Sequence, residues 1–183
     1  MKKALTLILA AGILIAALAA CGGLKRTVEV SDPLGRKVKA SYVIRGELAV
    51  IESAAASGLT LLKPEERDPL RASSSGTGEL IADALAQGCD DVIIGIGGSA
   101  TCDCGMGMLA ALGCGFSGAA SLEQVERVVL PKEPIWSKAR FRVACDVDNP
   151  LYGPNGAACV FAPQKGAGPE AVRWLDKGLA HFA

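Results

Sequence analysis

Alternating polar and apolar residues dominate the chain from residue 26 to residue 53. The segments "RTVEV" (26–30), "KVKASYVI" (37–44) and "ELAVIES" (47–53) share this period of two. Such a period is typical of β-strands with one buried face. Pro33 and Gly35 suit a turn after the first segment, and Arg45-Gly46 lies at or near the tip of a hairpin between the other two. We therefore expect an antiparallel sheet portion over residues 26–52, followed by a short helical turn in "AAASG" (54–58).

The pattern then changes to one in which helices and strands alternate. The segment "GELIADALAQGC" (78–89) predicts an amphipathic helix, because its apolar residues fall on one side. The apolar runs "DDVIIGIGG" (90–98) and "FRVACDV" (141–147) predict buried strands near residues 91–96 and 141–146. We also expect a small-residue helix at the end of "ATCDCGMGMLAALGC", a short strand in "ACVFAP" (158–163), and a final helix with Pro169 near its first turn. These elements predict an α/β fold.

The first 23 residues form a separate segment, ahead of a domain over residues 24–183. Two lysines precede a long apolar run that ends in small residues, as in a secretory signal. "LAAC" (18–21) also fits a lipoprotein signal, with Cys21 as the lipidated residue. The alternative is an apolar helix of a soluble domain that ends at Gly22-Gly23. Both interpretations predict helix over residues 4–20.

Composition excludes several classes of function. The net charge is zero and no basic stripe occurs, so nucleic acid is not an expected partner. The seven cysteines are odd in number, and four of them lie in apolar runs: Cys89, Cys114, Cys145 and Cys159. We expect reduced, mostly structural thiols in a cytosol-like compartment. His181 is the only histidine and lies near the end of the chain, which argues against a zinc site and against a Ser-His-Asp triad.

Three polar loops follow predicted strands, at the sheet edge where α/β proteins bind ligands. In the first loop, Gly97 and Gly98 would allow the backbone to approach an anion, and Ser99 and Thr101 could donate hydrogen bonds. Asp103 could hold Mg²⁺ through water or accept a proton. The alternative is a glycine-rich turn without a ligand, since this loop is neither a Walker A loop nor a dinucleotide-binding one.

The other two loops carry charged residues. Asp146 and Asp148 are two residues apart and precede Asn149, so both carboxylates could hold a metal bound to phosphate, or one could act as a base. An Asx-turn explains the same residues equally well. Lys165, next to Gln164, could hold a carboxylate or phosphate, or could simply be a solvated lysine. We predict that the three loops surround a common cleft.

Several longer motifs occur together and in order: "DPLGRKVKASY", "AVIESAAASGL", "ERDPLRASSSGTGELI", "VIIGIGGSATCDCGMGML" and "VACDVDNPLYGPNGAACVFAPQKGAGPE". As a set they resemble the middle part of bacterial glycerate kinases of the glycerate 2-kinase type, from about Thr27 to the end of the chain. The resemblance implies a cytoplasmic enzyme that uses ATP and Mg²⁺ to phosphorylate D-glycerate to 2-phosphoglycerate. It also implies a two-domain fold, in which this chain is the inserted mixed-sheet domain and most of the flavodoxin-like domain is absent.

The match to the family pattern extends to the loop residues Gly97, Gly98, Ser99, Thr101, Asp103, Asp146, Asp148, Asn149, Gln164 and Lys165. The resemblance also has departures. Cys102 and Cys104 stand where the family has Asn and Gly, Ser75 replaces a tyrosine, and the family's opening and closing motifs are missing. We therefore expect little or no kinase activity from this chain alone. The alternatives are a non-catalytic remnant and an exported lipoprotein that uses the domain as a binding module, held at the membrane only if Cys21 is lipidated.

Overall fold

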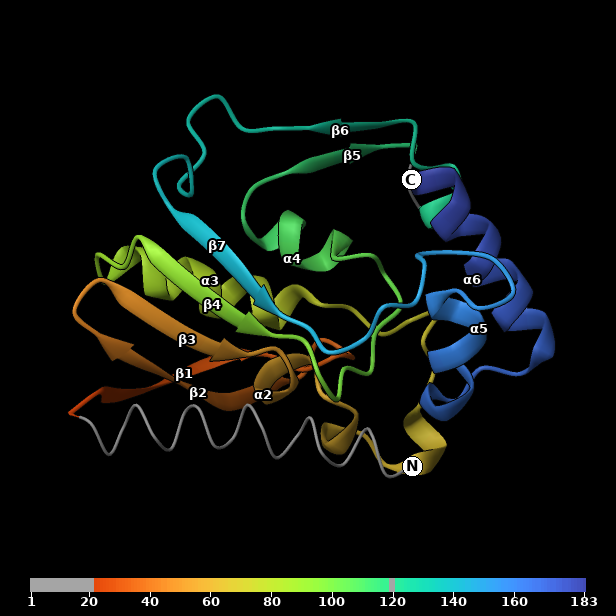
Figure 1. Cartoon of the computed structure of the whole chain (residues 1–183), viewed down its shortest axis with the longest axis horizontal. Helices are drawn as coiled ribbons and strands as arrows, with labels where there is room; N and C mark the ends of the chain where they lie inside the picture. The colour runs from red at the N-terminus through yellow and green to blue at the C-terminus, as the bar shows by residue number, and fades with distance from the viewer. Residues whose placement is uncertain (1–21, 119–120) are drawn as a thin grey trace.

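Five strands form the central sheet, in the spatial order β1-β2-β3-β4-β7 (Figure 1). The computed structural model describes residues 22–118 and 121–183. The strands of this sheet are β1 (Leu24–Ser31), β2 (Lys37–Arg45), β3 (Leu48–Glu52), β4 (Asp91–Gly95) and β7 (Arg140–Ala144). The neighbours β1, β2 and β3 are antiparallel, whereas β3, β4 and β7 are parallel. The expected α/β class, the mixed sheet and the antiparallel portion over residues 26–52 are confirmed.

The helices lie mainly to one side and at one end of this sheet (Figure 1). They are α2 (Ala54–Ser57), α3 (Ser75–Ala86), α4 (Met106–Ala111), α5 (Ala157–Phe161) and α6 (Pro169–Phe182), with short 3₁₀ turns at Leu59–Leu61, Pro64–Glu66, Leu122–Gln124 and Pro163–Lys165. A separate two-stranded sheet pairs β5 (Gly115–Ser117) with β6 (Arg127–Val129). Helix α6 begins at Pro169, as expected, because proline at the first helical position loses no hydrogen bond.

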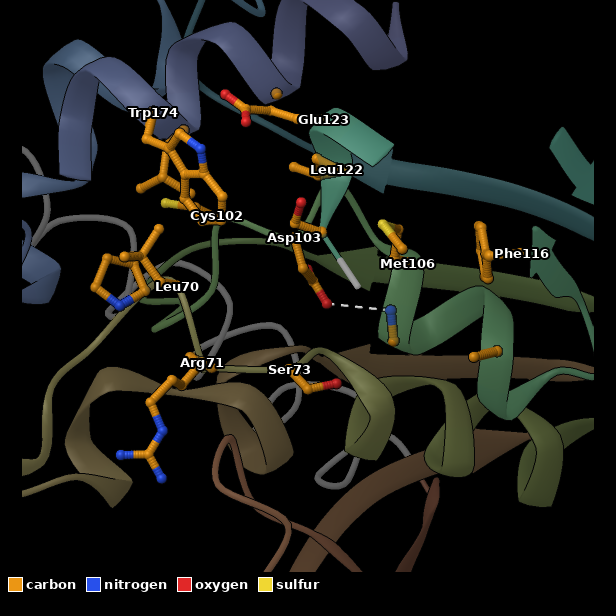
Figure 2. A pocket seen from close by; sticks show the side chains of 17 residues that line it. Leu70, Arg71, Ser73, Cys102, Asp103, Met106, Phe116, Leu122, Glu123 and Trp174 are labelled. Carbon is orange, nitrogen blue, oxygen red and sulfur yellow. Dashed lines mark hydrogen bonds between the residues drawn. The ribbon is translucent and has the colours of Figure 1, made fainter. Parts of the chain in front are cut away.

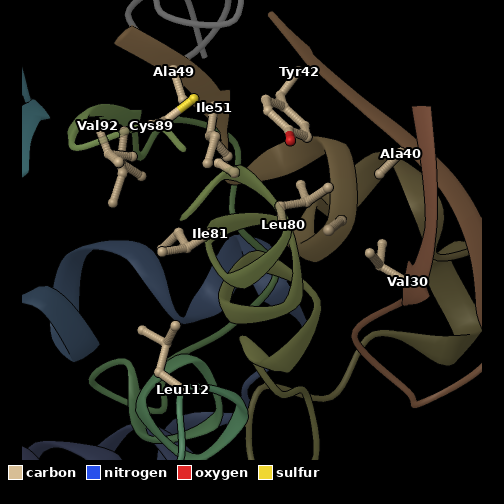
Figure 3. Close-up of a cluster of buried hydrophobic side chains, with 13 residues drawn as sticks. Val30, Ala40, Tyr42, Ala49, Ile51, Leu80, Ile81, Cys89, Val92 and Leu112 are labelled. Atoms are coloured by element: carbon tan, nitrogen blue, oxygen red, sulfur yellow. The ribbon is translucent and has the colours of Figure 1, made fainter. Parts of the chain in front are cut away.

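The main core lies between the sheet and α3 (Figure 3). Leu80 and Ile81 of α3 are fully buried with Ile51 and Val92 of the sheet. Helix α4 packs closely on α3 because Gly78 has no side chain. A Cβ at this position would lie only 2.3 Å from the Met108 carbonyl oxygen. This packing places the loop before α4 next to the loop before α3.

Two expectations about the second half of the chain are wrong. The segment "ACVFAP" forms α5 instead of a strand, because Ala158 and Ala162 are both buried at a helical spacing of four. A short apolar run does not by itself distinguish the two structures. Strand β7 exists, but it is the edge strand of the sheet and all five of its residues are exposed. Cys145, just after it, is therefore exposed and is not a core thiol, whereas Cys89 and Cys114 are buried as expected.

Some expectations lie outside the residues that the structure describes. The predicted helix over residues 4–20 and the candidate lipidation site Cys21 both fall within residues 1–21. Within residues 22–118 and 121–183, no helix has the length and apolarity needed to span a bilayer.

Candidate functional site

The site lies at the carboxyl ends of the three parallel strands. The register places Glu52, Gly95 and Ala144 in one row across β3, β4 and β7. In Figure 1 the three arrows point toward α5 and α6, so the loops that leave these strands gather at that end. The first polar loop, Gly97–Thr101, is called the glycine loop. It therefore begins next to the loop that carries Asp146 and Asp148, as the sequence predicted for this edge.

The glycine loop is held in place from two directions. On one side it bonds to the segment after β3: the Leu59 N–H donates to the Gly98 carbonyl at 2.8 Å, and the Ala100 N–H donates to the Ser57 carbonyl at 2.9 Å. Within the loop, the Thr101 N–H donates to Ser99 Oγ at 3.0 Å. Gly98 has a positive φ of 73°, a conformation that glycine adopts without steric cost. The loop is thus a fixed structure that exposes part of its backbone.

Asp103 organises the other end of this loop. Its carboxylate accepts hydrogen bonds from the Ser74 N–H at 2.8 Å and from Ser74 Oγ at 2.7 Å. It also accepts from the backbone N–H groups of Gly105 at 3.2 Å and Gly107 at 3.1 Å, the latter shown as a dashed line in Figure 2. Three of these donors bond to Oδ2, and the Gly105 N–H bonds to Oδ1. Asp103 therefore joins the loop before α3 to the start of α4, while Oδ1, with one bond among the described residues, retains acceptor capacity.

Cys104 occupies a backbone position suited to glycine. Its φ is +50°, which no other non-glycine residue shows in the part of the chain that the structure describes. The left-handed region costs an L-residue on the order of 1–2 kcal/mol. Neither Cys104 nor Cys102 is an activated thiol, because burial raises the pKa of both, although the Lys165 ammonium opposes the rise at Cys102.

Lys165 meets the glycine loop directly. Its ammonium donates to the Thr101 carbonyl at 2.6 Å, so the first and third predicted loops are in contact. Burial lowers the pKa of Lys165, with the neighbouring Cys102 and Asp103 opposing that effect. In this arrangement Lys165 positions the loop, while its neighbour Gln164 is exposed. The contact links the turn Pro163–Lys165 to the edge of the sheet.

The second predicted loop is open to solvent. Asp146, Asp148 and Asn149 are all exposed, and Asn149 Nδ2 donates to the Asn155 carbonyl at 3.0 Å. The register places this loop at the same edge as the glycine loop, but no contact joins the two among the hydrogen bonds of the described residues. A cleft common to all three loops therefore remains a prediction.

A cavity of about 320 Å³ lies beside Cys102 and Asp103, which follow the glycine loop (Figure 2). Asp103 and Cys102 form part of its wall, and Figure 2 shows Trp174 of α6 and Met106 of α4 bordering the same space. Of the predicted site residues only Asp103 lines it. Much of the remaining wall is apolar, which distinguishes this cavity from the polar loops at the edge of the sheet.

The structure adds residues that pattern reasoning missed. Ser74 is one of them: its hydroxyl donates to Asp103 and accepts a hydrogen bond from the Met108 N–H at 2.9 Å. Glu52 and Ser53 lie at the carboxyl end of β3, and the sequence did not mark them as site residues. Their position at the carboxyl end of a predicted strand was the one signal that could have indicated them.

Comparisons with known proteins identify relatives of the chain. The model of the glycerate kinase family matches residues 11–183. The chain is 50% identical over 167 residues to glycerate kinase of Haemophilus influenzae, covering 85% of this chain and 44% of that protein. It is 47% identical over 185 residues to glycerate 2-kinase of Escherichia coli K12, covering 94% and 48%.

A solved structure is similar over nearly the same region. It is the crystal structure of a Salmonella typhimurium LT2 protein assigned as a glycerate kinase 2, with a TM-score of 0.86 and 45% sequence identity. The superposition covers 91% of this chain and 48% of that one. The chain thus spans about half the length of the relatives that it matches.

Proposed function

Because the chain belongs to the glycerate kinase family, we propose that its sheet edge takes part in the ATP-dependent phosphorylation of D-glycerate to 2-phosphoglycerate. The observation that carries the proposal is the glycine loop Gly97–Thr101, fixed at the carboxyl edge of the parallel strands by hydrogen bonds to Ser57 and Leu59. Loops at this edge are where α/β proteins hold anionic ligands. Two relatives of the chain are named glycerate kinase and glycerate 2-kinase, which supports the choice of substrate.

Each loop has a proposed task in this reaction. The backbone at Gly97 and Gly98, with the hydroxyls of Ser99 and Thr101, binds an anionic group of the nucleotide or the substrate. Lys165 keeps this loop in place through the Thr101 carbonyl and contributes positive charge near it. Phosphoryl transfer depends on such positioning and charge stabilisation more than on covalent chemistry by the protein.

The residues after β7 fit a magnesium ion. Asp146 and Asp148 offer exposed carboxylates two residues apart, and oxygen ligands are those that Mg²⁺ prefers. No cluster of three or more His, Cys, Asp or Glu side chains that could hold a metal occurs in the described ranges. A site with one or two carboxylates is usual for Mg²⁺ that also binds nucleotide phosphates. When bound, the ion would neutralise negative charge on those phosphates.

We propose further that the 183-residue chain alone binds ligands but turns over little. Phosphoryl transfer draws most of its rate from a closed site that holds both substrates. Here Asp146, Asp148 and Asn149 face solvent, which leaves the metal-binding side of the site open. Strain at Cys104 also affects the loop that contacts the anion.

Calorimetry tests the proposed function on the purified chain. D-glycerate should bind saturably and be displaced by 2-phosphoglycerate, and ATP should bind only with Mg²⁺. The double variant Asp146→Ala/Asp148→Ala should weaken Mg²⁺-ATP binding at least about tenfold, because loss of an outer-shell partner of a metal already costs about 10–100-fold. Glu29→Gln, on the exposed face of β1, is the matched control. Absence of saturable D-glycerate binding would overturn the proposal.

A coupled assay of ADP release tests the expected low turnover. With D-glycerate, ATP and Mg²⁺, release should be little above the blank without glycerate, while E. coli glycerate 2-kinase in a parallel assay turns over normally. Strong glycerate-dependent release that disappears in Asp146→Ala would contradict the expectation and make the chain a complete enzyme.

A further inference from the structure

Two neighbouring residues at the end of β3 each carry a buried polar atom without a hydrogen-bond partner among the described residues. Glu52 Oε1 and Ser53 Oγ are buried and form no hydrogen bond within the described residues. Ser53 is only 7% exposed, so its hydroxyl is withdrawn from bulk solvent. Leaving a buried polar group unpaired costs about 1–3 kcal/mol, and native proteins rarely tolerate it without a function for the group.

The Ser53 hydroxyl makes no hydrogen bond within the described residues, although the backbone N–H and carbonyl of Ser53 are both hydrogen-bonded. The Ser53 N–H donates to the Gly95 carbonyl at 2.9 Å, and its own carbonyl accepts from the Ser57 N–H at 2.7 Å. The residue stands at the start of α2, where serine hydroxyls commonly cap the helix, but it makes no such bond. Its hydroxyl therefore remains available to a ligand.

Glu52 lies in the row of residues where ligands are expected. Its neighbour in β4 is Gly95 and the next residue in the row is Ala144 of β7, so only small residues adjoin it on this side. The segment that follows Glu52 carries Ser57, whose carbonyl accepts from the Ala100 N–H of the glycine loop. Glu52 and the glycine loop thus belong to one fixed edge, whereas Asp146 and Asp148 are exposed on the loop beside it.

We propose that Glu52 is the catalytic base for the substrate's hydroxyl, with the Ser53 hydroxyl bonded to the substrate's carboxylate; this rests on the proposed function. As the hydroxyl oxygen forms its bond to the γ-phosphorus, the bond from that phosphorus to the bridging oxygen breaks. ADP leaves with the electron pair, and the hydroxyl proton passes to Glu52 Oε1. Burial raises the pKa of the Glu52 carboxyl, which brings it nearer to neutral pH, where a general base works best.

Comparison of two ligands isolates the hydroxyl contact. 3-Hydroxypropionate carries the charge of D-glycerate but lacks the 2-hydroxyl group. Calorimetry on the purified chain should show that wild type prefers D-glycerate and that Glu52→Gln reduces this preference about tenfold, the effect of one hydrogen bond to a charged group. Ser53→Ala should weaken both ligands about equally, since both have a carboxylate, and Glu29→Gln should change neither.

Carbon-13 NMR of glutamate carboxyl groups provides a readout on the wild-type chain. A hydrogen bond donated to the ionised carboxylate lowers its pKa, so the Glu52 midpoint should lie about half a pH unit or more lower with saturating D-glycerate than with 3-hydroxypropionate. Equal midpoints, or an unchanged preference in Glu52→Gln, would overturn the role of Glu52 and leave the proposed function standing. If neither ligand binds the wild type, the proposed function fails, and this inference with it.

Discussion

Single residues set the shape of the glycine loop, and Cys104 is the one with the clearest conformational cost. Its φ of +50° lies in the region that favours glycine, and glycine is what the resemblance to glycerate kinases leads one to expect there. The side chain is half-buried beside Cys102 and Met106, against the cluster around Leu175. The loop therefore keeps its path despite the substitution, at a cost in stability.

Replacing Cys104 by glycine should stabilise the chain. Relief of the left-handed strain gains about 1–2 kcal/mol, and the greater freedom of glycine in the unfolded chain removes about half of that gain. We expect a net increase of roughly 0.5–1 kcal/mol in the free energy of unfolding, measured by urea denaturation. Cys104→Ala keeps the positive φ and serves as the control; a gain as large as that of glycine would show that the thiol, and not the backbone, is unfavourable.

Asp103 acts through four hydrogen bonds, so its loss should be structural. Asp103→Asn keeps one acceptor oxygen, and its new NH2 group faces either the Gly105 N–H or the N–H groups of Ser74 and Gly107. The free energy of unfolding should fall by about 1–3 kcal/mol, as it does when buried partners lose their acceptor. Asp148→Asn, in the exposed loop, should change it by less than about 0.5 kcal/mol. Equal effects of the two substitutions would contradict the assignment.

At the scale of elements, close approach of α3 and α4 brings the two halves of the site together. Gly78 and Gly107 lie at this contact, and a Cβ at Gly107 would come within 2.1 Å of Ser73 Oγ. The N-terminal ends of both helices are joined by Ser74 and Asp103. The position of the glycine loop thus depends on the absence of side chains between two helices.

Gly78→Ala tests this packing. Alanine is the better helix former by about 1 kcal/mol, so in an open position the change would stabilise α3. Overpacking against the Met108 carbonyl should instead lower the free energy of unfolding by about 1–3 kcal/mol. Thermal and urea unfolding measure the difference. Gly115→Ala is the control, because the nearest atom to its added Cβ is Val129 Cβ at an ordinary 3.6 Å; a stabilised Gly78→Ala would show that the helices can separate at little cost.

At the scale of the whole molecule, partly buried ion pairs hold the antiparallel strands, one within the β1–β2 turn and one between β1 and α3. Asp32 is 1% exposed and accepts hydrogen bonds from the N–H groups of Leu34 and Arg36 and from the Arg36 guanidinium. Asp83 of α3 accepts from Arg26 of β1 and from the hydroxyl of Tyr42 in β2. These contacts connect strands β1 and β2 to the helix that covers the core.

Both carboxylates should make the fold sensitive to acid. At Asp32 burial opposes ionisation, but the bonds from Arg36 and Leu34 outweigh it and lower the pKa; at Asp83 the bond from Arg26 lowers the pKa. A folded pKa below the unfolded value of about 3.9 stabilises the folded state above that pH and loses this effect as pH falls through the folded value. Glu52, whose pKa is raised by burial, acts in the opposite sense.

Urea unfolding from pH 7 down to pH 3 measures this effect. The free energy of unfolding should decrease below about pH 5, and the decrease should be smaller in the double variant Asp32→Asn/Asp83→Asn. Glu29→Gln, which changes an exposed carboxylate on β1, should retain the wild-type slope. A slope unchanged in the double variant would assign the acid sensitivity to other groups.

The sequence by itself determined the local elements, the loops after the strands and the family. Period-two alternation records which face of β1 and β2 is buried, and Pro169 marks where α6 begins, because both depend on neighbours along the chain. The long motifs pointed to glycerate kinases, and the family match confirmed that resemblance. The chemistry of Gly97–Thr101 and of Asp146 and Asp148 was visible as residue types at expected positions.

Only the tertiary structure decided which polar side chains have hydrogen-bond partners and which do not. The sequence offered Asp103 as a residue that could hold Mg²⁺ through water or accept a proton, whereas its bond to Ser74 joins residues 29 positions apart, a contact that no local pattern encodes. Strand β7 is exposed because it has a neighbour on one side alone, and α5 is a helix because Ala158 and Ala162 find a buried surface. Glu52 and Ser53 stand out only once the contacts of every neighbour are known. A lack of partners is a property of the assembled fold, since burial and pairing both arise from residues distant in sequence.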